Sequence, residues 1–495
     1  MRALRSSRGS GRVLIFLPLS LPGVALLAGC KVGPNYKRPD VTVQSNWSRP
    51  TKTPASVVDD ASPPAAWWAT LHDPKLDSLV QRASYANLSL SIATSRIREA
   101  RAQRSIAAGG LLPRVGASGG YTYNRGAGPL FPVNTGDYQF YTSGFDAVWE
   151  ADIFGGIRRS VEAAQADLEA QEDARRGVLV SIVAEVARNY VELRTTQQRL
   201  IIANANIRTQ SESLDVAKRL NAAGIVSDLD VTRARAELTQ TQSEVPAFEI
   251  QEKAAIHQLG ILLGEAPQAL MAELRPIGPI PAPARRVPIG LPSELLRRRP
   301  DVRQVERQLA AAVARIGVAE ADLYPKVTLT GDFGFGAQQP ADVFNWSNRF
   351  VSVGPAVRWE LFQGGRILAN IEARKAIRQE MLDQYRLTIL TALREVEDAL
   401  TAFNRRQEQF NFLSQSVESS RASVRIASER YAGGTIDYLS LLDAQRAQLK
   451  AEDAMVVSQG EITLNLIALY KAIGGGWEAF ERDEHPTTAA SPLRR

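Results

Sequence analysis

Cysteine and histidine are scarce in this chain of 495 residues, which contains one cysteine and three histidines. A single cysteine excludes a framework of intramolecular disulfides. The histidines, His72, His257 and His485, are scattered, and no spacing among them predicts a metal site. The glycine-rich stretch that begins at Gly331 has no lysine placed to meet a phosphate, and no serine has a neighbouring histidine. These absences argue against an enzyme.

Long apolar runs are also missing, since no stretch approaches the roughly 18 uncharged apolar residues that a transmembrane helix needs. The first apolar run, "VLIFLPLSLPGVALLAG", is short and interrupted by prolines. It follows four arginines, and this order is typical of a secretory signal peptide. We therefore expect residues 1–29 to be removed, which lowers the formal net charge from +6 to about +2. So small a charge gives no reason to expect nucleic-acid binding.

The single cysteine, Cys30, comes directly after this signal. The tetrad Leu27-Ala28-Gly29-Cys30 resembles the lipobox of bacterial lipoproteins, in which the signal is cut before the cysteine and its sulfur and amine receive acyl chains. Several acyl chains, at roughly 0.8 kcal/mol per buried methylene, anchor a protein durably. We therefore predict that Cys30 is a lipid anchor. An aspartate directly after the cysteine would resemble the signal that retains lipoproteins in the inner membrane. Lys31 stands there instead, so we expect the anchor to lie in the outer membrane. The alternative is an incidental cysteine in a discarded signal. No other cofactor is expected.

Two internal repeats make up most of the chain. "LLPRV" at Leu111 resembles "LYPKV" at Leu323, and "WEADIFGG" resembles "WELFQGG". Three pairs of matching residues lie 210 positions apart: Trp149 and Trp359, Gly224 and Gly434, and Gly264 and Gly474. A proline-rich stretch between the copies predicts an extended linker. One supersecondary unit therefore occurs twice.

This pattern predicts six segments. They are a signal peptide at residues 1–29, a lipid-anchored extended segment at 30–72, a first repeat at 73–273, a linker at 274–292, a second repeat at 293–476 and a flexible tail at 477–495. Each repeat is expected to contain a helix, two strands and a long helical hairpin.

Proline is absent from Val133 to Val245 and from Ala356 to His485, which favours long helices. In the second copy, apolar residues recur every three or four positions from Met381 to Phe403, forming one helical stripe. A helix over residues 156–221 would be roughly 100 Å long, too long for a globular core, so we expect a coiled coil. After the turns at Gly224 and Gly434, the chain would run back as the second helix of each hairpin. Pro246 should kink or interrupt the first returning helix.

Four shorter stretches alternate between apolar and polar residues and predict β-strands, at residues 115–123, 141–149, 327–335 and 351–361. Their length and aromatic content suit an outer-membrane barrel, although a soluble sandwich hairpin would show the same alternation. Four strands cannot close a barrel, and open edges are not tolerated in lipid. Two chains would supply 8 strands and a filled interior, whereas three would supply 12 and leave a lumen. We therefore predict a mixed α/β membrane channel, a homotrimer in which a 12-strand barrel continues as a coiled-coil tube.

Several motifs occur together and in order, and with them the chain resembles the outer-membrane efflux factor family, the TolC-like channels, in its lipoprotein branch. They are "GCKVGPNYKRP", "WEADIFGG", "WELFQGG", "LLRRRPDVRQVERQLAAAVARIGVAEADLYPKVTLTGDFG", "YAGGTIDYLSLLDAQRAQL" and "ALYKAIGGGW". The resemblance implies an exit duct in the outer membrane whose helices cross the periplasm. It also implies docking to a periplasmic adaptor and an inner-membrane RND-type transporter.

The resemblance places a periplasmic gate in the hairpin that begins at Tyr431. Asp443 matches a carboxylate that points into the lumen, Leu439 matches an apolar constriction, and Tyr431 matches a tyrosine that holds the returning helix inward. The alternatives are a solvated carboxylate for Asp443 and coiled-coil packing for Leu439. Ser440 replaces a second carboxylate of some relatives, and Asp437 would supply part of that charge.

The first copy contributes further candidates to the gate and its surroundings. Arg219, Asp228 and Asp230 are candidate gate partners across the hairpins. An adaptor bound around the tips would favour the open arrangement, and the expected tip contacts are Gly224, Ile225, Gly434 and Thr435. The sequence thus predicts passive efflux of drugs or other small toxic compounds. A duct for secreted proteins and a periplasmic coiled-coil scaffold are the alternative functions.

Overall fold

The computed structural model describes residues 30–41, 44, 47, 56–58, 63–125, 137–283 and 286–481. The expected signal peptide and residues 482–495 lie outside the described residues. Two compact units are present. The sheet unit contains the described parts of Met1–Pro34 with Ala107–Ser160 and Arg315–Ile371, and the helical unit contains the described parts of Asn35–Ile106, Val161–Ala314 and Glu372–Arg495.

The sheet unit is built on one antiparallel sheet of four strands in the order β2-β3-β5-β6. The strands are β2 Arg114–Asn124, β3 Tyr138–Ala151, β5 Lys326–Ala337 and β6 Arg349–Arg358. The four predicted strands are confirmed and form this one sheet, although β6 ends three residues before the expected Leu361. Among the described strands, β2 and β6 each have a partner on one side only.

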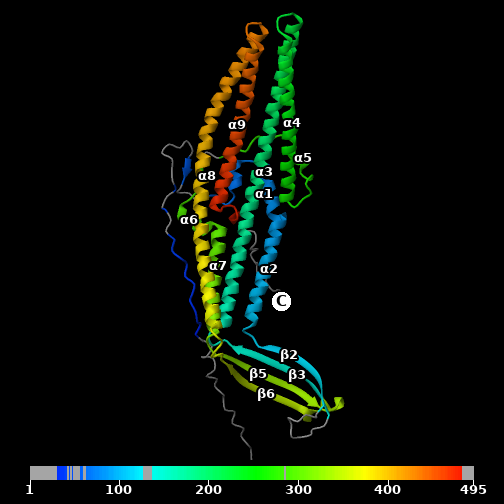
Figure 1. Cartoon of the computed structure of the whole chain (residues 1–495), viewed down its shortest axis with the longest axis vertical. Coiled ribbons are helices and arrows are strands. Elements are labelled where there is room, and N and C mark those ends of the chain that lie inside the picture. The colour runs from blue at the N-terminus through cyan, green and yellow to red at the C-terminus, as the bar shows by residue number, and fades with distance from the viewer. Residues whose placement is uncertain are drawn as a thin grey trace, which may run out of the picture. The chain divides into compact units, whose positions relative to one another are not determined.

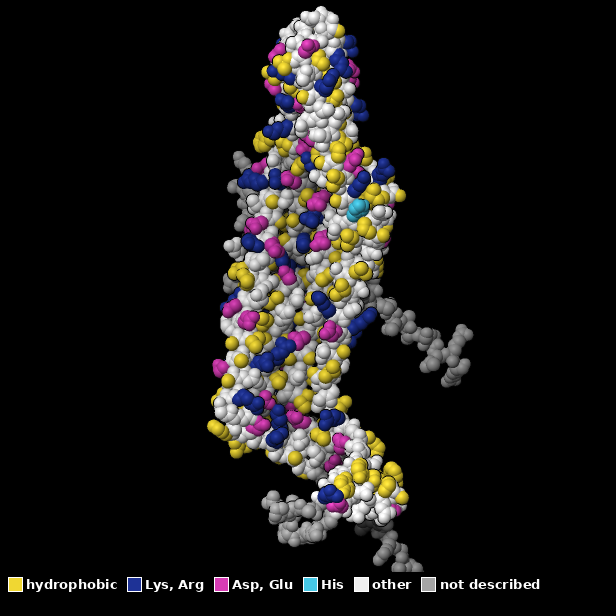
Figure 2. Space-filling model, turned by 45° about the vertical axis from the view of Figure 1, so that its right-hand side comes forward, with side chains coloured by type: hydrophobic (Ala, Val, Ile, Leu, Met, Phe, Trp, Pro, Cys, Tyr) yellow, Lys and Arg dark blue, Asp and Glu magenta, His cyan; other side chains and the backbone are white. Residues whose placement is uncertain are grey.

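One face of the sheet is apolar and open to solvent in the single chain. Val115, Phe145, Val351 and Val353 lie on it, and each is more than half exposed. Figure 2 shows hydrophobic side chains gathered over this part of the sheet unit. The opposite face is more polar, because Asp146 and Asp332 are paired across strands β3 and β5, with threonines nearby. Such a sheet needs an apolar environment on one side and water on the other.

The helical unit is dominated by two long hairpins (Figure 1). The first consists of α3 Gly156–Ala222, whose first residues belong to the sheet unit, and α4 Asp228–Leu262, and the second consists of α8 Arg366–Ala432 and α9 Tyr438–Ile473. The remaining helices are α1 Pro74–Ala86, α2 Leu88–Gly109, α5 Met271–Leu274, α6 Pro292–Arg298, α7 Pro300–Ala321 and α10 Glu478–Glu481, with a 3₁₀ turn η2 at Trp67–Leu71. Each hairpin thus belongs to one repeat.

Helix α4 is continuous through Pro246, so the interruption expected there does not occur. Proline removes one backbone hydrogen bond from a helix. Thr241 and Phe248, on either side of the proline, are both buried, so the helix packs against its neighbours before and after the proline.

The main core of the helical unit combines both repeats. Tyr190 and Leu193 of α3 are buried in the same cluster as Tyr385 and Ile389 of α8 and Leu469 of α9. Each of these side chains is at most about 1% exposed. Neither repeat therefore buries its apolar stripe without the other.

The linker between the repeats is held by side chains that donate to its carbonyl oxygens. Arg194 donates to the carbonyl of Pro276 at 2.7 Å, and Thr463 donates to that of Pro281 at 2.7 Å. Each proline lacks an N–H, so these hydrogen bonds use the carbonyl oxygens, which the prolines retain. Strand β4 at Arg286–Pro288 pairs in parallel with β1 at Ser56–Val58, and this two-stranded sheet was not predicted.

The segment after α9 packs on the core, although we expected a flexible tail from residue 477 onward. Trp477 is buried, with the guanidinium groups of Arg176 and Arg303 5.0 and 5.6 Å from its ring centroid. Glu478 pairs with Arg298 at 2.6 Å. An aromatic ring close to two guanidinium groups gains cation–π attraction as well as burial, and both fix this segment on the core.

Replacing Trp477 with alanine should lower the free energy of unfolding of the helical unit by about 3 to 5 kcal/mol, as for other buried large aromatic residues. Thermal denaturation followed by circular dichroism measures this. Trp346→Ala is the matched control, because Trp346 is 65% exposed and its removal should change stability little. Equal effects of the two variants would contradict the packing described here.

Candidate functional site

The tips of the two hairpins are tight turns with matching geometry. Gly224 and Gly434 have φ angles of +73° and +68°, a left-handed conformation that glycine adopts without strain. The amide of Ile225 donates to the carbonyl of Leu220 at 2.9 Å, and Thr435 N donates to Arg430 O at 2.9 Å. Both turns therefore cap the last carbonyls of their first helix, α3 or α8, in the same way.

The two tips pack against each other within one chain. A Cβ added to Gly434 would lie 3.8 Å from Cγ2 of Ile225. Behind the turns, a small apolar cluster joins all four long helices, with members Leu214, Ala217, Ala234, Ala427, Tyr431, Tyr438, Leu441 and Leu442. The predicted tip residues are thus close together, and the cluster behind them holds the hairpins in register.

Tyr431 and Tyr438 form the centre of this cluster. Each is 1% exposed, and their ring centroids lie 5.4 Å apart in an edge-to-face arrangement. The Tyr431 hydroxyl is buried without a hydrogen-bond partner among the described residues. Burial, and then the charge of Asp230, raise the pKa of Tyr431. Burial, and then the charge of Glu237, raise the pKa of Tyr438 to about 12.

The other predicted gate residues of the second hairpin lie on the surface at the start of α9. Asp437 is the N-cap residue, and it accepts from Ser440 N at 3.3 Å and from the Ser440 hydroxyl. These hydrogen bonds lower the pKa of Asp437. Leu439 is 42% exposed, and Asp443, one turn later, is also exposed. Leu439 and Asp443 thus share one exposed face of α9.

The candidate partners in the first hairpin have local roles in this chain. Asp228 accepts from Asn221 Nδ2 at 3.1 Å, which braces the first turn. Asp230 lies 3.9 Å from a guanidinium nitrogen of Arg233. Arg219 is exposed, and its side chain makes no ion pair within the described part of the chain. The structure does not bring Arg219 together with Asp228 or Asp230.

A polar seam between the hairpins was missed by the sequence analysis. Gln445 of α9 donates to Ser213 Oγ of α3 at 2.7 Å. One turn before Ser213, Gln210 is 3% exposed, and its amide nitrogen and oxygen have no hydrogen-bond partner among the described residues. Farther from the tip, the buried carboxylate of Glu452 accepts from Arg421 Nε at 2.7 Å. Buried polar groups with missing partners cost free energy.

A second missed contact crosses from α4 to α9. The buried carboxylate of Glu237 pairs with Arg446 at 2.7 Å. Tyr438, Gln445 and Glu452 are spaced by seven residues, as are Asn206 and Ser213, so the seam occupies core positions of a coiled coil. This heptad spacing is the pattern in the sequence by which these buried polar residues could have been predicted. Polar core residues specify register at a cost in stability.

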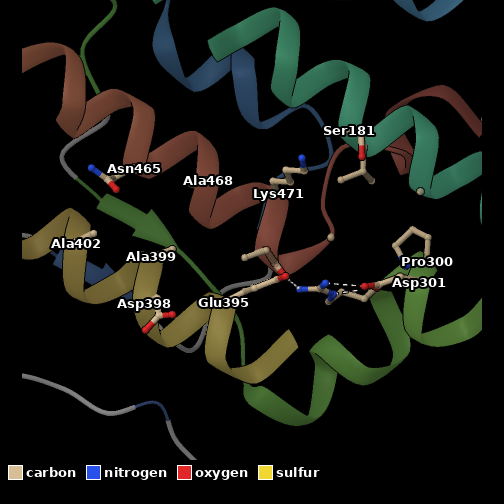
Figure 3. A pocket seen from close by; sticks show the side chains of 15 residues that line it. Ser181, Pro300, Asp301, Glu395, Asp398, Ala399, Ala402, Asn465, Ala468 and Lys471 are labelled. Atoms are coloured by element: carbon tan, nitrogen blue, oxygen red, sulfur yellow. Dashed lines mark hydrogen bonds and ion pairs between the residues drawn. The ribbon is translucent and has the colours of Figure 1, made fainter. Parts of the chain in front are cut away.

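A separate groove of about 600 Å³ lies nearer the middle of the helical unit, between α3, α8, α9 and the start of α7. Figure 3 shows Ser181, Asp398 and Lys471 among the side chains around it. Arg299 bridges Asp301 and Glu395 at 2.6 and 2.7 Å there, so these three charged groups are paired with one another. Arg299 thus links the start of α7 to α8.

Metal binding and helical membrane spans were also searched for in the described ranges. In this part of the chain no three His, Cys, Asp or Glu side chains gather in a way that would hold a metal ion. None of the described helices is both long and apolar enough to cross a membrane.

Comparison with known proteins identifies the family. The family model described as outer membrane efflux protein matches residues 79–265 and 291–475, one stretch for each repeat. This chain belongs to the outer membrane efflux protein family. Members of this family are efflux ducts and not enzymes, they lie in the outer membrane, and their helical part is periplasmic.

Individual relatives of this efflux protein cover almost its whole length. The pyoverdine export outer membrane protein OpmQ of Pseudomonas aeruginosa is 32% identical over 93% of this chain and 97% of its own. The toluene efflux pump outer membrane protein TtgC of Pseudomonas putida is 30% identical over 91% of this chain and 94% of its own. The solved outer-membrane channel OprN superposes with a TM-score of 0.85, at 37% identity, over 91% of this chain and all of its own.

The buried tyrosines predict an alkaline limit to the packing of the tips. The pKa values of Tyr431 and Tyr438 are raised in the folded chain, so folding favours the neutral form of each side chain. The stability that this contributes is fully present below the ordinary tyrosine pKa of about 10. Stability should fall as the pH rises from about 10 to about 12. In thermal denaturation over this range, Tyr438→Phe should reduce the loss, and the exposed Tyr121→Phe should leave it unchanged. An undiminished loss in Tyr438→Phe would contradict the assignment.

Proposed function

We propose that this efflux protein is the outer-membrane exit duct of a tripartite pump. In this proposal three copies form a 12-strand barrel, and their hairpins continue it as a coiled-coil tube into the periplasm. A periplasmic adaptor and an RND-type inner-membrane transporter deliver drugs or other small toxic compounds, which pass through the duct passively. The observation that supports this most strongly is a four-stranded sheet with two edges lacking a described partner and one exposed apolar face.

The choice of compounds is proposed to lie with the transporter. OpmQ is named for pyoverdine export and TtgC for toluene efflux, yet this chain is 32% and 30% identical to them over nearly its whole length. Proteins of one fold and similar identity thus carry names of dissimilar compounds. A wide conduit that makes few specific contacts would accept all of them.

The anchor and the segment boundaries belong to the same proposal. Cys30, the first described residue, is exposed, as an acylated residue must be. Residues 30–72 would run as the lipid-anchored segment, followed by the first repeat at 73–273, the linker at 274–292 and the second repeat at 293–476. The adaptor would contact the tips at Gly224, Ile225, Gly434 and Thr435.

The gate is proposed to lie at the start of α9. Leu439 and Asp443 share an exposed face, so a threefold axis would bring three copies of each toward the lumen. Like charges that close together raise one another's pKa, and a ring of carboxylates attracts cations. Asp437 would add to this charge, and Arg219, Asp228 and Asp230 would face it from the neighbouring hairpins.

Opening is proposed to occur along the polar seam between the hairpins. Gln210 and Gln445 have buried polar atoms without a hydrogen-bond partner among the described residues. Water that enters when the hairpins separate would bind these atoms and offset part of the free energy lost on separation. Tyr431 and Tyr438 supply the apolar contact that holds the tips together. An adaptor that binds the parted tips more tightly than the packed tips would shift the population toward the open state.

Replacing Asp443 or Tyr431 with alanine should raise single-channel conductance in planar bilayers. The first change removes a ring of charge at the constriction, and the second removes the aromatic ring that packs against Tyr438 and holds the tips together. Glu418→Ala is the control, because Glu418 is an exposed carboxylate of α8 far from the tip, and it should behave as the unaltered protein does. Unchanged conductance in both test variants would reject the gate, and no conductance at all in the unaltered protein would reject the duct.

A further inference from the structure

The first turn of α3 binds the backbone just after Cys30. Arg159, whose side chain is fully buried, donates from Nε to the carbonyl of Val32 at 2.9 Å and from a terminal nitrogen to that of Gly33 at 2.8 Å. The amide of Val32 donates to the carbonyl of Phe154 at 3.1 Å. Three successive peptide groups are thus each held by one hydrogen bond, and two of these bonds come from a charged donor.

The position of Arg159 is fixed by the cap of α3. The carboxylate of Asp152 accepts from the amides of Ile157 and Arg158 at 3.0 and 2.9 Å. The amide of Arg159 then donates to the carbonyl of Gly155 at 2.8 Å. A carboxylate at a helix N-terminus stabilises the first turn, so the guanidinium is presented from a rigid element.

Three glycines shape the same place for a close approach of backbones. Gly33 has a φ of +86°, and a Cβ added to it would overlap the Cα of Gly317 on α7. A Cβ on Gly317 would lie 2.8 Å from Nε of Arg159. A Cβ on Gly155 would lie 3.0 Å from the Cα of Lys31. We call Arg159 with these three glycines the seat of the N-terminal segment.

The second repeat has no such seat. Its matching turn, "FQGG", contains Gly364 and Gly365, and a Cβ added to either would meet no described atom within 4 Å. Leu368, in the first turn of α8, is 61% exposed. The repeats have therefore diverged where the first one meets the N-terminal segment, and the buried arginine is not explained by the repeat fold alone.

We propose that Arg159 is a positioning residue for the membrane anchor, which it holds by seating residues 31–33. This inference rests on the proposed acylation of Cys30. With Val32 fixed, Cys30 can move no more than about 7 Å from the seat, at about 3.5 Å per residue. A chain held only from Tyr36 onward, where the hydroxyl donates to Glu306, would give Cys30 a reach of about 20 Å. The seat therefore fixes the point at which the acyl chains leave the protein.

Trypsin cleavage after Lys31 tests the seat in the purified full-length protein in detergent. A seated backbone resists proteolysis, because a protease must draw several residues into its own cleft. Arg159→Gln removes the charged donor, and Gly33→Ala obstructs the seat from the other side while leaving Arg159 in place. Both variants should release the Cys30–Lys31 fragment about tenfold faster than the unaltered protein, or more. Lys326→Gln is the control, because it breaks an ion pair with Asp322 elsewhere in the sheet unit.

Cleavage after Arg219, near the hairpin tip, shows whether a variant has lost structure in general or only the contact at the seat. We expect this cleavage to be equally fast in the unaltered protein, the two seat variants and the control. The inference is overturned if Arg159→Gln and Gly33→Ala are cleaved after Lys31 no faster than the control, or if cleavage after Arg219 rises equally.

The mass of the intact chain tests acylation independently. Acyl groups on Cys30 with slow cleavage in both variants would overturn the seat and leave the acylation standing. An unmodified Cys30 with fast cleavage in both variants would overturn the acylation and the anchoring role, and leave the seat as a contact of the unmodified segment.

Discussion

The unpaired edges of the sheet are the constraint on which the rest of this molecule depends. Backbone groups at β2 and β6 lack described partners on one side, and the face beside them is apolar and exposed. An unpaired backbone group in hydrocarbon costs several kcal/mol, so the sheet cannot enter a bilayer as one chain. The proposed assembly with other copies would resolve both problems, because the edges would pair and the apolar face would meet lipid. The family and the fold of OprN agree with this environment.

The helical unit is built from two kinds of interface that differ in strength. Around Tyr190, Tyr385 and Leu469 the repeats share a dry apolar core that joins them permanently. Toward the tips the same helices meet through amides, a hydroxyl and carboxylates, and several of these polar atoms have no partner in the part of the chain that the structure describes. An apolar base that stays packed, and a tip whose polar contacts cost free energy, suit a hairpin that moves only at its tip. The seat at Arg159 adds a third contact. It lies at the N-terminal end of α3, whereas the hairpin tip follows the C-terminal end of that helix.

The repeats, the long helices and the four strands were predictable because each follows from a period in the sequence. The tip residues were found through a family resemblance, and α9 places Leu439 and Asp443 on one exposed face as their spacing predicts. Glu237 and Gln210 were missed, since a buried polar residue looks like a surface one when only the sequence of its own helix is considered. Of the kink or interruption expected at Pro246, the interruption does not occur. The packing of Trp477 was missed because its arginine partners are distant in sequence.

Disulfide trapping between the sheet edges tests the central claim most directly. In a chain that lacks Cys30, one cysteine would be placed on the outer edge of β2 and one on the outer edge of β6. If neighbouring copies close the sheet, oxidation in outer membranes should link chains into covalent trimers, and either single-cysteine variant should give none. Links confined to one chain, or a ladder that ends at dimers, would contradict a barrel shared by three protomers.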